Sequence, residues 1–235
     1  FILNPLASGE AVLTEQEREM GVVVIDIGGG TTDLAIYIEG TVWHTAVIPV
    51  GGDLITNDIT HWMRVPFDVA EAVKIHYGHA LQRAVDPLEK FLVEPFGEGL
   101  PIEVQRSAMA EVIEMRVTEI FDLVRKEIKR SGYDGLLRAG AVITGGSSQL
   151  EGVREVAARE LSFPVRLAKP ERLTGMADAL RNPAYSTSVG LLRLGLQMDT
   201  AARTPAGTGA ALPNLKIGSI LGGLFRRLLP ADQDG

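Results

Sequence analysis

The segment Val22–Asp33 constrains the fold of this chain more than any other, and it reads VVVIDIGGGTTD. A β-branched run from Val22 to Ile25 leads to Asp26, after which come three glycines and two threonines. A short apolar run bounded by glycine fits a buried strand better than a helix. Because glycine lets the backbone turn tightly and approach a ligand, we expect this strand to end in a binding turn.

The turn after this strand has the chemistry of a phosphate site. Successive backbone amides, together with the hydroxyls of Thr31 and Thr32, form a concave donor surface for phosphate oxygens. Asp26, at the carboxyl end of the strand, is suited to hold a metal ion or an attacking water. The alternative interpretation of the same residues is a glycine-rich hairpin turn that joins a strand at 22–27 to one at 32–38.

Composition excludes several other classes of protein. The net charge of −7 argues against a general nucleic-acid surface, and we expect no nucleic-acid partner. The chain has no cysteine, which rules out disulfides and thiolate zinc sites and suits a cytosolic location. The four histidines, His44, His61, His76 and His79, form no convincing metal set, so we expect structural or surface roles for them.

Further along the chain, strands and helices alternate and are joined by glycine-rich turns. Hydrophobic patterns predict strands at 22–27, 32–38, 41–49, 139–144 and 164–168, and helices at 54–63, 66–78, 104–131, 149–161 and 186–197. Residues 85–103, which contain three prolines, are expected to be irregular. The order is typical of an α/β fold with its ligand at the carboxyl ends of the strands. A second strand-and-glycine unit, AVITGGSS, ends at Gly145–Gly146–Ser147.

The C-terminal residues differ in character from the rest. Residues 198–214 are small, polar and interrupted by Pro and Gly, which predicts a flexible linker. The segment at 215–230 is basic and amphipathic, which favours binding to an anionic membrane surface. Its apolar side comprises Ile217, Ile220, Leu221, Leu224, Phe225 and Leu228, and its basic residues are Lys216, Arg226 and Arg227. Two alternatives are a terminal helix packed on the core and a segment that docks in a partner's groove.

Together the motifs resemble one family. GVVVIDIGGGTTDLAIY, VIPVGGDLITNDIT, AEAVKIHYG, VITGGSSQLEGV and NPAYSTSVGLL look like segments of FtsA, the bacterial actin-like cell-division family, over roughly residues 3–197. The resemblance implies an α/β fold: the second half of an actin-like ATPase (ribonuclease-H-like), with a mixed sheet, flanking helices and a mainly helical insertion. Subdomain 2A would comprise 1–50 and 139–197, and subdomain 2B would comprise 51–138. Because the sequence starts at Phe1 and not at Met, we expect a fragment, and the resemblance implies that it lacks the first half of the nucleotide cleft.

The same resemblance implies roles for individual residues with ATP and Mg²⁺ as ligands. Asp26 would lie near the metal and the attacking water, and Glu71 and Lys74 would flank the adenosine. The remaining nucleotide contacts would be Gly28, Gly29, Gly30, Thr31 and Thr32 at the phosphates, Gly51, Gly52 and Asp53 near the ribose, and Gly145, Gly146 and Ser147 at the adenine. For Glu71 and Lys74, three residues apart on a helix, the alternative is a plain surface ion pair.

The resemblance also implies a function. FtsA proteins anchor the FtsZ ring to the cytoplasmic face of the cell membrane at the division site and polymerise there. We therefore expect the FtsZ C-terminal tail, other copies of the protein, an anionic membrane and, through the missing half, later division proteins as partners. Arg106 and Arg116 are candidate FtsZ contacts. ATP would act as an assembly switch, with slow hydrolysis at most. The alternatives are a phosphotransferase of the same superfamily (a sugar kinase or polyphosphatase) and a pilus-assembly adaptor.

Overall fold

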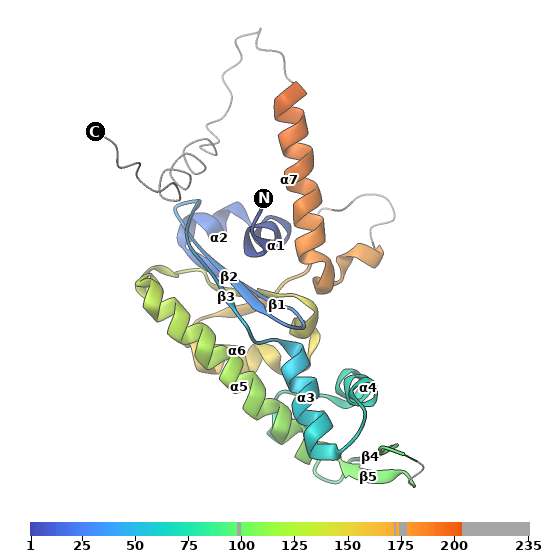
Figure 1. The fold of residues 1–235 in the computed structure, drawn as a ribbon. Helices are drawn as coiled ribbons and strands as arrows, with labels where there is room; N and C mark the ends of the chain where they lie inside the picture. The colour runs from blue at the N-terminus through green and yellow to red at the C-terminus, as the bar shows by residue number, and fades with distance from the viewer. Residues whose placement is uncertain (98–99, 172, 174–177, 204–235) are drawn as a thin grey trace, which may run out of the picture. The chain divides into compact units, whose positions relative to one another are not determined.

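A computed structural model describes residues 1–97, 100–171, 173 and 178–203 of the chain (Figure 1). The chain divides into two compact units, residues 1–198 and 199–235. The expected membrane segment lies outside the described residues, with all nine of its side chains. These are Lys216, Ile217, Ile220, Leu221, Leu224, Phe225, Arg226, Arg227 and Leu228.

Five strands form a mixed sheet at the centre of the fold, in the order β3-β2-β1-β6-β7 (Figure 1). They are β1 Val22–Ile27, β2 Thr32–Ile38, β3 Thr41–Ile48, β6 Gly140–Thr144 and β7 Val165–Leu167. Strand β1 is buried along its whole length, which explains its continuous apolar run. It pairs antiparallel with β2, so the predicted hairpin is confirmed, with residues 28–31 as its turn.

The register of β1 and β6 brings the two glycine turns to one edge of the sheet. The strands are parallel, with Val22 opposite Gly140 and Asp26 opposite Thr144. Both therefore end at the same edge, and the turns that follow them start side by side. Neighbouring strands that are distant in sequence thus build the region in which we expected the ligand.

Helices cover both faces of this sheet (Figure 1). On one face, α1 (Asn4–Val12) and α7 (Ser186–Arg203) pack on side chains of β1, β2 and β6, among them Val22, Val24 and Tyr37. On the other face, α5 (Arg106–Ser131) and α6 (Val153–Leu161) complete the larger core, in which Phe121 is fully buried. The short helix α2 (Glu15–Met20) begins with a capping box between Thr14 and Glu17.

The inserted segment contains more strand than the sequence predicted. Helices α3 (Gly52–Met63) and α4 (Phe67–Tyr77) lie toward one end of α5, beside a hairpin of β4 (Lys90–Val93) and β5 (Ile102–Gln105) (Figure 1). The expectation of irregular structure at 85–103 and of a helix starting at 104 was therefore wrong. Strand β4 alternates exposed and buried residues, and its Phe91 stacks on Tyr77 of α4 with ring centroids 4.4 Å apart.

Several helix ends also differ from the predicted ones. Helix α3 begins at Gly52, two residues early, and α6 begins at Val153, after a 3₁₀ turn at Gly146–Gln149. Helix α7 continues to Arg203, so the first residues of the expected linker are helical. The remaining 3₁₀ turns are Gln82–Ala84, Asp134–Leu136, Asp178–Arg181 and Pro183–Tyr185. Within the described ranges, no helix combines the length and apolarity needed to cross a membrane.

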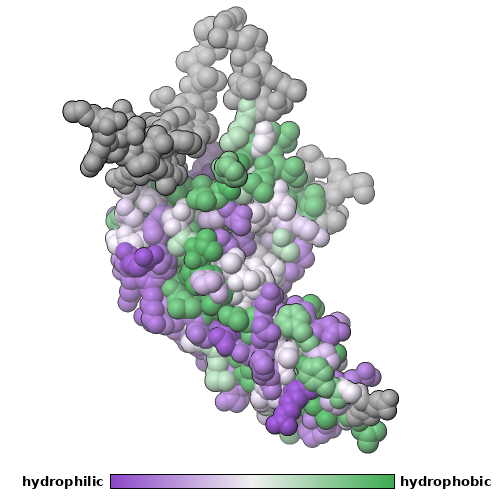
Figure 2. All heavy atoms as spheres, in the orientation of Figure 1, coloured by the Kyte–Doolittle hydropathy of each residue, from purple (hydrophilic) through white to green (hydrophobic). Residues whose placement is uncertain are grey.

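The outer side of α7 carries several exposed apolar side chains. Leu191, Leu192, Leu196 and Met198 are each at least 40% exposed. Figure 2 shows hydrophobic side chains gathered around this helix, in contrast to the hydrophilic surface of much of the visible face. An apolar surface of this kind usually marks a site of contact with further protein.

Candidate functional site

The two glycine turns touch through a single hydrogen bond. Ser147 Oγ, in the turn after β6, donates to the carbonyl oxygen of Gly28, in the turn after β1, at 2.9 Å. Gly145 has a φ of +91°, and a Cβ there would clash with Oδ1 of Asp26 and the carbonyl oxygen of Ile27. Only glycine fits this position without strain, because its backbone passes directly over the end of β1.

A third glycine segment joins the first turn at the start of α3. The amide of Gly52 donates to the carbonyl oxygen of Gly28, and the amide of Asp53 donates to that of Gly29, both at 2.9 Å. A Cβ on Gly51 would lie 2.8 Å from the carbonyl oxygen of Gly28. The Gly28 carbonyl oxygen therefore accepts hydrogen bonds from both of the other glycine segments.

The turn itself is closed at its base and open at its tip. The Gly28 amide donates to the carbonyl oxygen of Thr31 at 2.9 Å. Gly29 and Gly30 are exposed, and a Cβ added to Gly30 would meet nothing within 4 Å. This exposed, side-chain-free backbone fits a ligand that approaches the main chain, as phosphate oxygens do.

The two threonines of the turn differ from the prediction. Thr32 is fully buried, and its hydroxyl donates to the carbonyl oxygen of Val50 at 2.8 Å. The expectation that its hydroxyl faces phosphate was therefore wrong, since Thr32 instead ties β2 to the segment before α3. Thr31 is half-buried and its hydroxyl donates to Asp33 Oδ2 at 2.8 Å.

Glu71 and Lys74 of α4 form an ion pair that belongs to this site. Lys74 Nζ lies 2.7 Å from Glu71 Oε2 and donates to the carbonyl oxygen of Gly52 at 3.2 Å. Its side chain is only 12% exposed. Thr56 of α3 completes the cluster, because it accepts from Lys74 at 2.8 Å and donates to the Glu71 carboxylate. The alternative of a plain surface ion pair does not describe this arrangement.

Asp26 lies at the bottom of the site and is 8% exposed. Its Oδ2 accepts hydrogen bonds from Ser8 of α1 and, at 2.9 Å, from Thr187 of α7. Burial raises the pKa of Asp26 above its usual value, although the two hydroxyl bonds act in the opposite direction. The described residues include no group of three or more His, Cys, Asp or Glu that could hold a metal ion. Any Mg²⁺ near Asp26 would need further ligands, which nucleotide phosphates supply in many Mg²⁺ sites.

Sequence reasoning missed Ser8, Thr56 and Thr187. Each is a hydroxyl whose partner is brought close only by folding, and a lone Ser or Thr in a helix has no distinctive pattern. The local signal that did exist is the small-residue run Ala7–Ser8–Gly9, which lets α1 approach its neighbours closely.

The two arginines expected to contact FtsZ are engaged within the chain. Arg116 forms a bidentate pair with Asp58 of α3, at 2.6 and 2.8 Å, and also contacts Glu119. Arg106 pairs with Glu89 at 2.8 Å and donates to the carbonyl oxygen of Tyr77. Both side chains are at most 25% exposed, so they fix α5 to its neighbours and offer little free positive charge.

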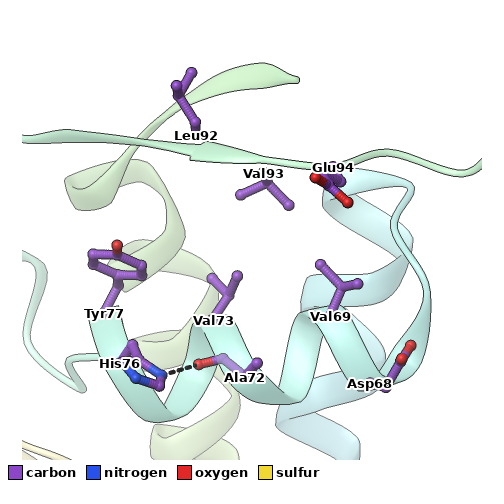
Figure 3. A pocket seen from close by; sticks show the side chains of 9 residues that line it. All are labelled: Asp68, Val69, Ala72, Val73, His76, Tyr77, Leu92, Val93 and Glu94. Atoms are coloured by element: carbon purple, nitrogen blue, oxygen red, sulfur yellow. Dashed lines mark hydrogen bonds between the residues drawn. The ribbon is translucent and has the colours of Figure 1, made fainter. Parts of the chain in front are cut away.

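A separate hollow of about 370 Å³ lies between α4 and β4 (Figure 3). Val69, Val73, Tyr77 and Val93 supply apolar surface, whereas the side chain of Leu92 points away from α4, on the other side of β4. Asp68, His76 and Glu94 add polar groups, and His76 Nδ1 lies 3.0 Å from the carbonyl oxygen of Ala72. Two of the other histidines contact the chain elsewhere: His44 pairs with Glu127, and His79 accepts from the Leu81 amide.

Comparison with known proteins identifies relatives of this chain. The family model described as "Cell division protein FtsA" matches residues 23–190. The chain is 48% identical over 211 residues to cell division protein FtsA of Pseudomonas aeruginosa, covering 90% of this chain and 51% of that protein. It is 42% identical over 229 residues to FtsA of Neisseria meningitidis, covering 97% of this chain and 54% of that protein. It is 44% identical over 202 residues to FtsA of Escherichia coli K12, covering 83% of this chain and 48% of that protein. The chain spans about half the length of these curated relatives.

Solved structures share the fold at lower identity. MreB5 of Spiroplasma citri bound to ADP aligns with a TM-score of 0.68 and 20% identity, covering 86% of this chain and 61% of that one. The PilM–PilN type IV pilus biogenesis complex and the MamK double helical filament each give a TM-score of 0.60 and 17% identity. They cover 83% and 82% of this chain, and 52% and 58% of their own chains. The predicted actin-like α/β fold is confirmed.

Proposed function

This chain belongs to the FtsA family of cell-division proteins, and we propose that it supplies one wall of an ATP site that controls assembly at the division site. The observation that carries the proposal is the arrangement around the Gly28 carbonyl oxygen. It accepts from Gly52 N and from Ser147 Oγ, both at 2.9 Å, so three glycine segments from distant parts of the sequence meet at one atom.

Each part of the wall has a chemical role in this proposal. The exposed amides at Gly29 and Gly30 would receive the phosphates, and Gly51–Asp53 would border the ribose. Glu71 and Lys74 would flank the adenosine, and Gly145–Ser147 would lie along the adenine. Among the residues assigned to this wall, Lys74 is the one cation and pairs with Glu71, and Asp26 and Asp53 add two further carboxylates. Mg²⁺ bound with the nucleotide would supply the positive charge that this set of side chains lacks.

The second wall of the cleft would come from protein that packs on the apolar side of α7. The chain spans about half the length of these relatives, and Leu191 and Leu192 leave 40% and 65% of their surface exposed. ATP held between two walls would set the relative position of the halves and so favour polymerisation. In this role the nucleotide acts mainly as a switch, and hydrolysis is slow at most.

Membrane and FtsZ attachment complete the proposed function. The basic amphipathic segment at 215–230 would bind anionic lipid on the cytoplasmic face of the membrane. The FtsZ C-terminal tail would dock on the inserted segment, where the hollow between α4 and β4 offers a concave apolar surface with Asp68 and Glu94 at its edge (Figure 3). Co-sedimentation of the intact protein with anionic vesicles, with and without residues 215–230, tests the first contact. Unchanged binding after the deletion would rule it out.

The nucleotide site is tested by a pair of glycine substitutions. A Cβ meets nothing within 4 Å at either Gly30 or Gly135, so alanine should be accepted by the fold at both positions. Gly135→Ala is the control, because it lies in the turn at Asp134–Leu136, between α5 and β6. We expect Gly30→Ala in the intact protein to weaken binding of a fluorescent ATP analogue while Gly135→Ala leaves it unchanged. Equal affinities for both variants would count against a phosphate contact at this turn.

A further inference from the structure

The start of α7 is fastened to the sheet edge by hydroxyl groups that the proposed nucleotide contacts do not use. Ser186 and Thr187 are the first two residues of this helix. Ser186 Oγ lies 2.6 Å from Thr144 Oγ1 at the end of β6, and both residues are fully buried. Thr187 Oγ1 donates to Asp26 Oδ2 at 2.9 Å near the end of β1. Since Asp26 and Thr144 are paired in register, α7 holds both strands at the same level.

Helix α1, on the same face of the sheet, joins the same group. Ser8 is fully buried, donates to Asp26 Oδ2 and lies 2.9 Å from Thr187 Oγ1. Beside these hydroxyls the two helices are in backbone contact, because a Cβ on Gly190 would overlap the main chain of Ala7. We call Ser8, Asp26 and Thr187 the hydroxyl latch.

The latch determines where the Asp26 side chain can sit. A carboxylate with so little exposure needs hydrogen-bond donors, and each hydroxyl has one proton to give. The Asp26 carboxylate is stabilised most when the hydroxyl protons of Ser8 and Thr187 both point at Oδ2. On the other side, Oδ1 faces the backbone of Gly145 with no room for a Cβ. Any shift of this carboxylate must therefore move α1, α7 or the second glycine turn.

The position of Asp26 affects the candidate site because Gly28 lies only two residues further along the chain. Asp26 precedes Ile27 and Gly28, whose carbonyl oxygen joins the three glycine segments. Gly145, against which the carboxylate packs, begins the turn that contains Ser147. A ligand that repositions either turn therefore acts on the hydroxyl latch, and through it on the crossing of α1 and α7.

We propose that Ser8 and Thr187 are positioning residues that couple the nucleotide site to the crossing of α1 and α7 through Asp26. The inference rests on the proposed nucleotide function, and it assigns the two hydroxyls a role that a purely structural contact would not have. A structural contact would add stability with or without nucleotide. The hydroxyl latch instead makes the response of α1 and α7 to nucleotide depend on the two hydroxyl groups.

The test uses Thr187→Val, which keeps the shape of the side chain and removes the hydroxyl, and Thr187→Ser, which keeps the hydroxyl. Hydrogen exchange of residues 4–12 and 186–194 in the intact protein is measured with and without ATP and Mg²⁺, alongside ATP affinity. We expect Thr187→Val to lose the ATP-induced change in exchange and to bind ATP about tenfold more weakly. Thr187→Ser should behave as the wild type does. Ser8→Ala provides a second variant if Thr187→Val does not fold.

The outcomes separate the two proposals. If Thr187→Val and Ser8→Ala keep both the wild-type affinity and the wild-type ATP-induced change in exchange, the hydroxyl latch has no positioning role. The same holds if they exchange faster to an equal extent with and without ATP, because that describes a structural contact only. If the wild-type protein itself binds no ATP, the proposed function fails first and the coupling fails with it.

Discussion

The hydroxyl of Ser147 lies 2.9 Å from the carbonyl oxygen of Gly28, a residue 119 positions earlier in the chain. This bond exists because β1 and β6 are parallel neighbours, which places their following turns at one edge of the sheet. The amide of Gly52 shares the same acceptor. A glycine-rich turn that would be unremarkable alone is thereby built into a surface made from three segments.

Lys74 should matter far more than a typical surface lysine. The Lys74 side chain is only 12% exposed, and Lys74→Met removes its ammonium group. The Glu71 carboxylate and the Gly52 carbonyl oxygen then lose this donor. We expect a loss of about 1–3 kcal/mol in the free energy of unfolding, measured by urea denaturation, together with weaker ATP binding. The matched control is Lys90→Met, whose pair with Glu103 is more than half exposed on both sides. Exposed pairs contribute about 0–1 kcal/mol, so equal effects of the two substitutions would contradict this assignment.

The environment of Asp26 leads us to expect that the contribution of this residue to stability falls as the pH rises. Burial raises its pKa in the folded protein above the ordinary value of 3.8. Between those two pKa values the folded state binds the proton more tightly than the unfolded state, so this residue lowers stability as the pH rises. The destabilisation by the buried Asp26 charge is complete above the folded-state pKa and absent below about pH 3.8.

We therefore expect Asp26→Asn to melt at a higher temperature than the wild type at pH 7, with a difference that shrinks as the pH falls toward 4. The amide oxygen of Asn can still accept from Ser8 and Thr187, so the substitution removes the charge and keeps the acceptor. Thermal melting curves at several pH values give the answer. A variant that is less stable at pH 7, or a difference that grows on acidification, would show that the burial cost is not the dominant effect.

The hollow between α4 and β4 is the expected site for an FtsZ tail peptide, and a charge placed in it should weaken binding of that peptide. Ala72 of α4 lines the hollow and is exposed, whereas Ile75 of the same helix is 69% exposed and lies outside it. Glutamate at either position should leave the fold unchanged, because both side chains are largely in solvent. We expect Ala72→Glu to weaken binding of the peptide to the intact protein and Ile75→Glu to have little effect, as measured by fluorescence anisotropy. Binding that is unaffected by Ala72→Glu would place the tail elsewhere.

Local sequence patterns predicted the sheet well because its strands carry strong signals. The predicted bounds of β1 and β2 match the observed ones, and the predicted β3 ends one residue too late, at 49 and not at Ile48. The hairpin of β4 and β5 escaped prediction because each strand has only four residues and prolines lie between them. Strands this short are stabilised by packing, here of Phe91 on Tyr77, which no local pattern reveals.

The glycine positions of the candidate site could be predicted from the sequence, but its hydroxyl contacts could not. Gly51 and Gly145 stand at positions where the backbone of one segment approaches another, and each lies in a glycine pair that is visible in the sequence. Thr32 was assigned to the ligand because it follows the turn, yet its place in β2 directs it into the interior. Ser8 and Thr187 meet Asp26 across 18 and 161 residues, so only the folded chain brings them together.

The most direct test of the nucleotide site is hydrogen exchange across the intact protein on addition of ATP and Mg²⁺. We predict slower exchange in three separate segments at once, residues 28–31, 51–53 and 145–147, with no change at the hollow around Val69 and Leu92. Protection confined to one of these segments, or protection that appears at the hollow while the three glycine segments exchange as before, would contradict it.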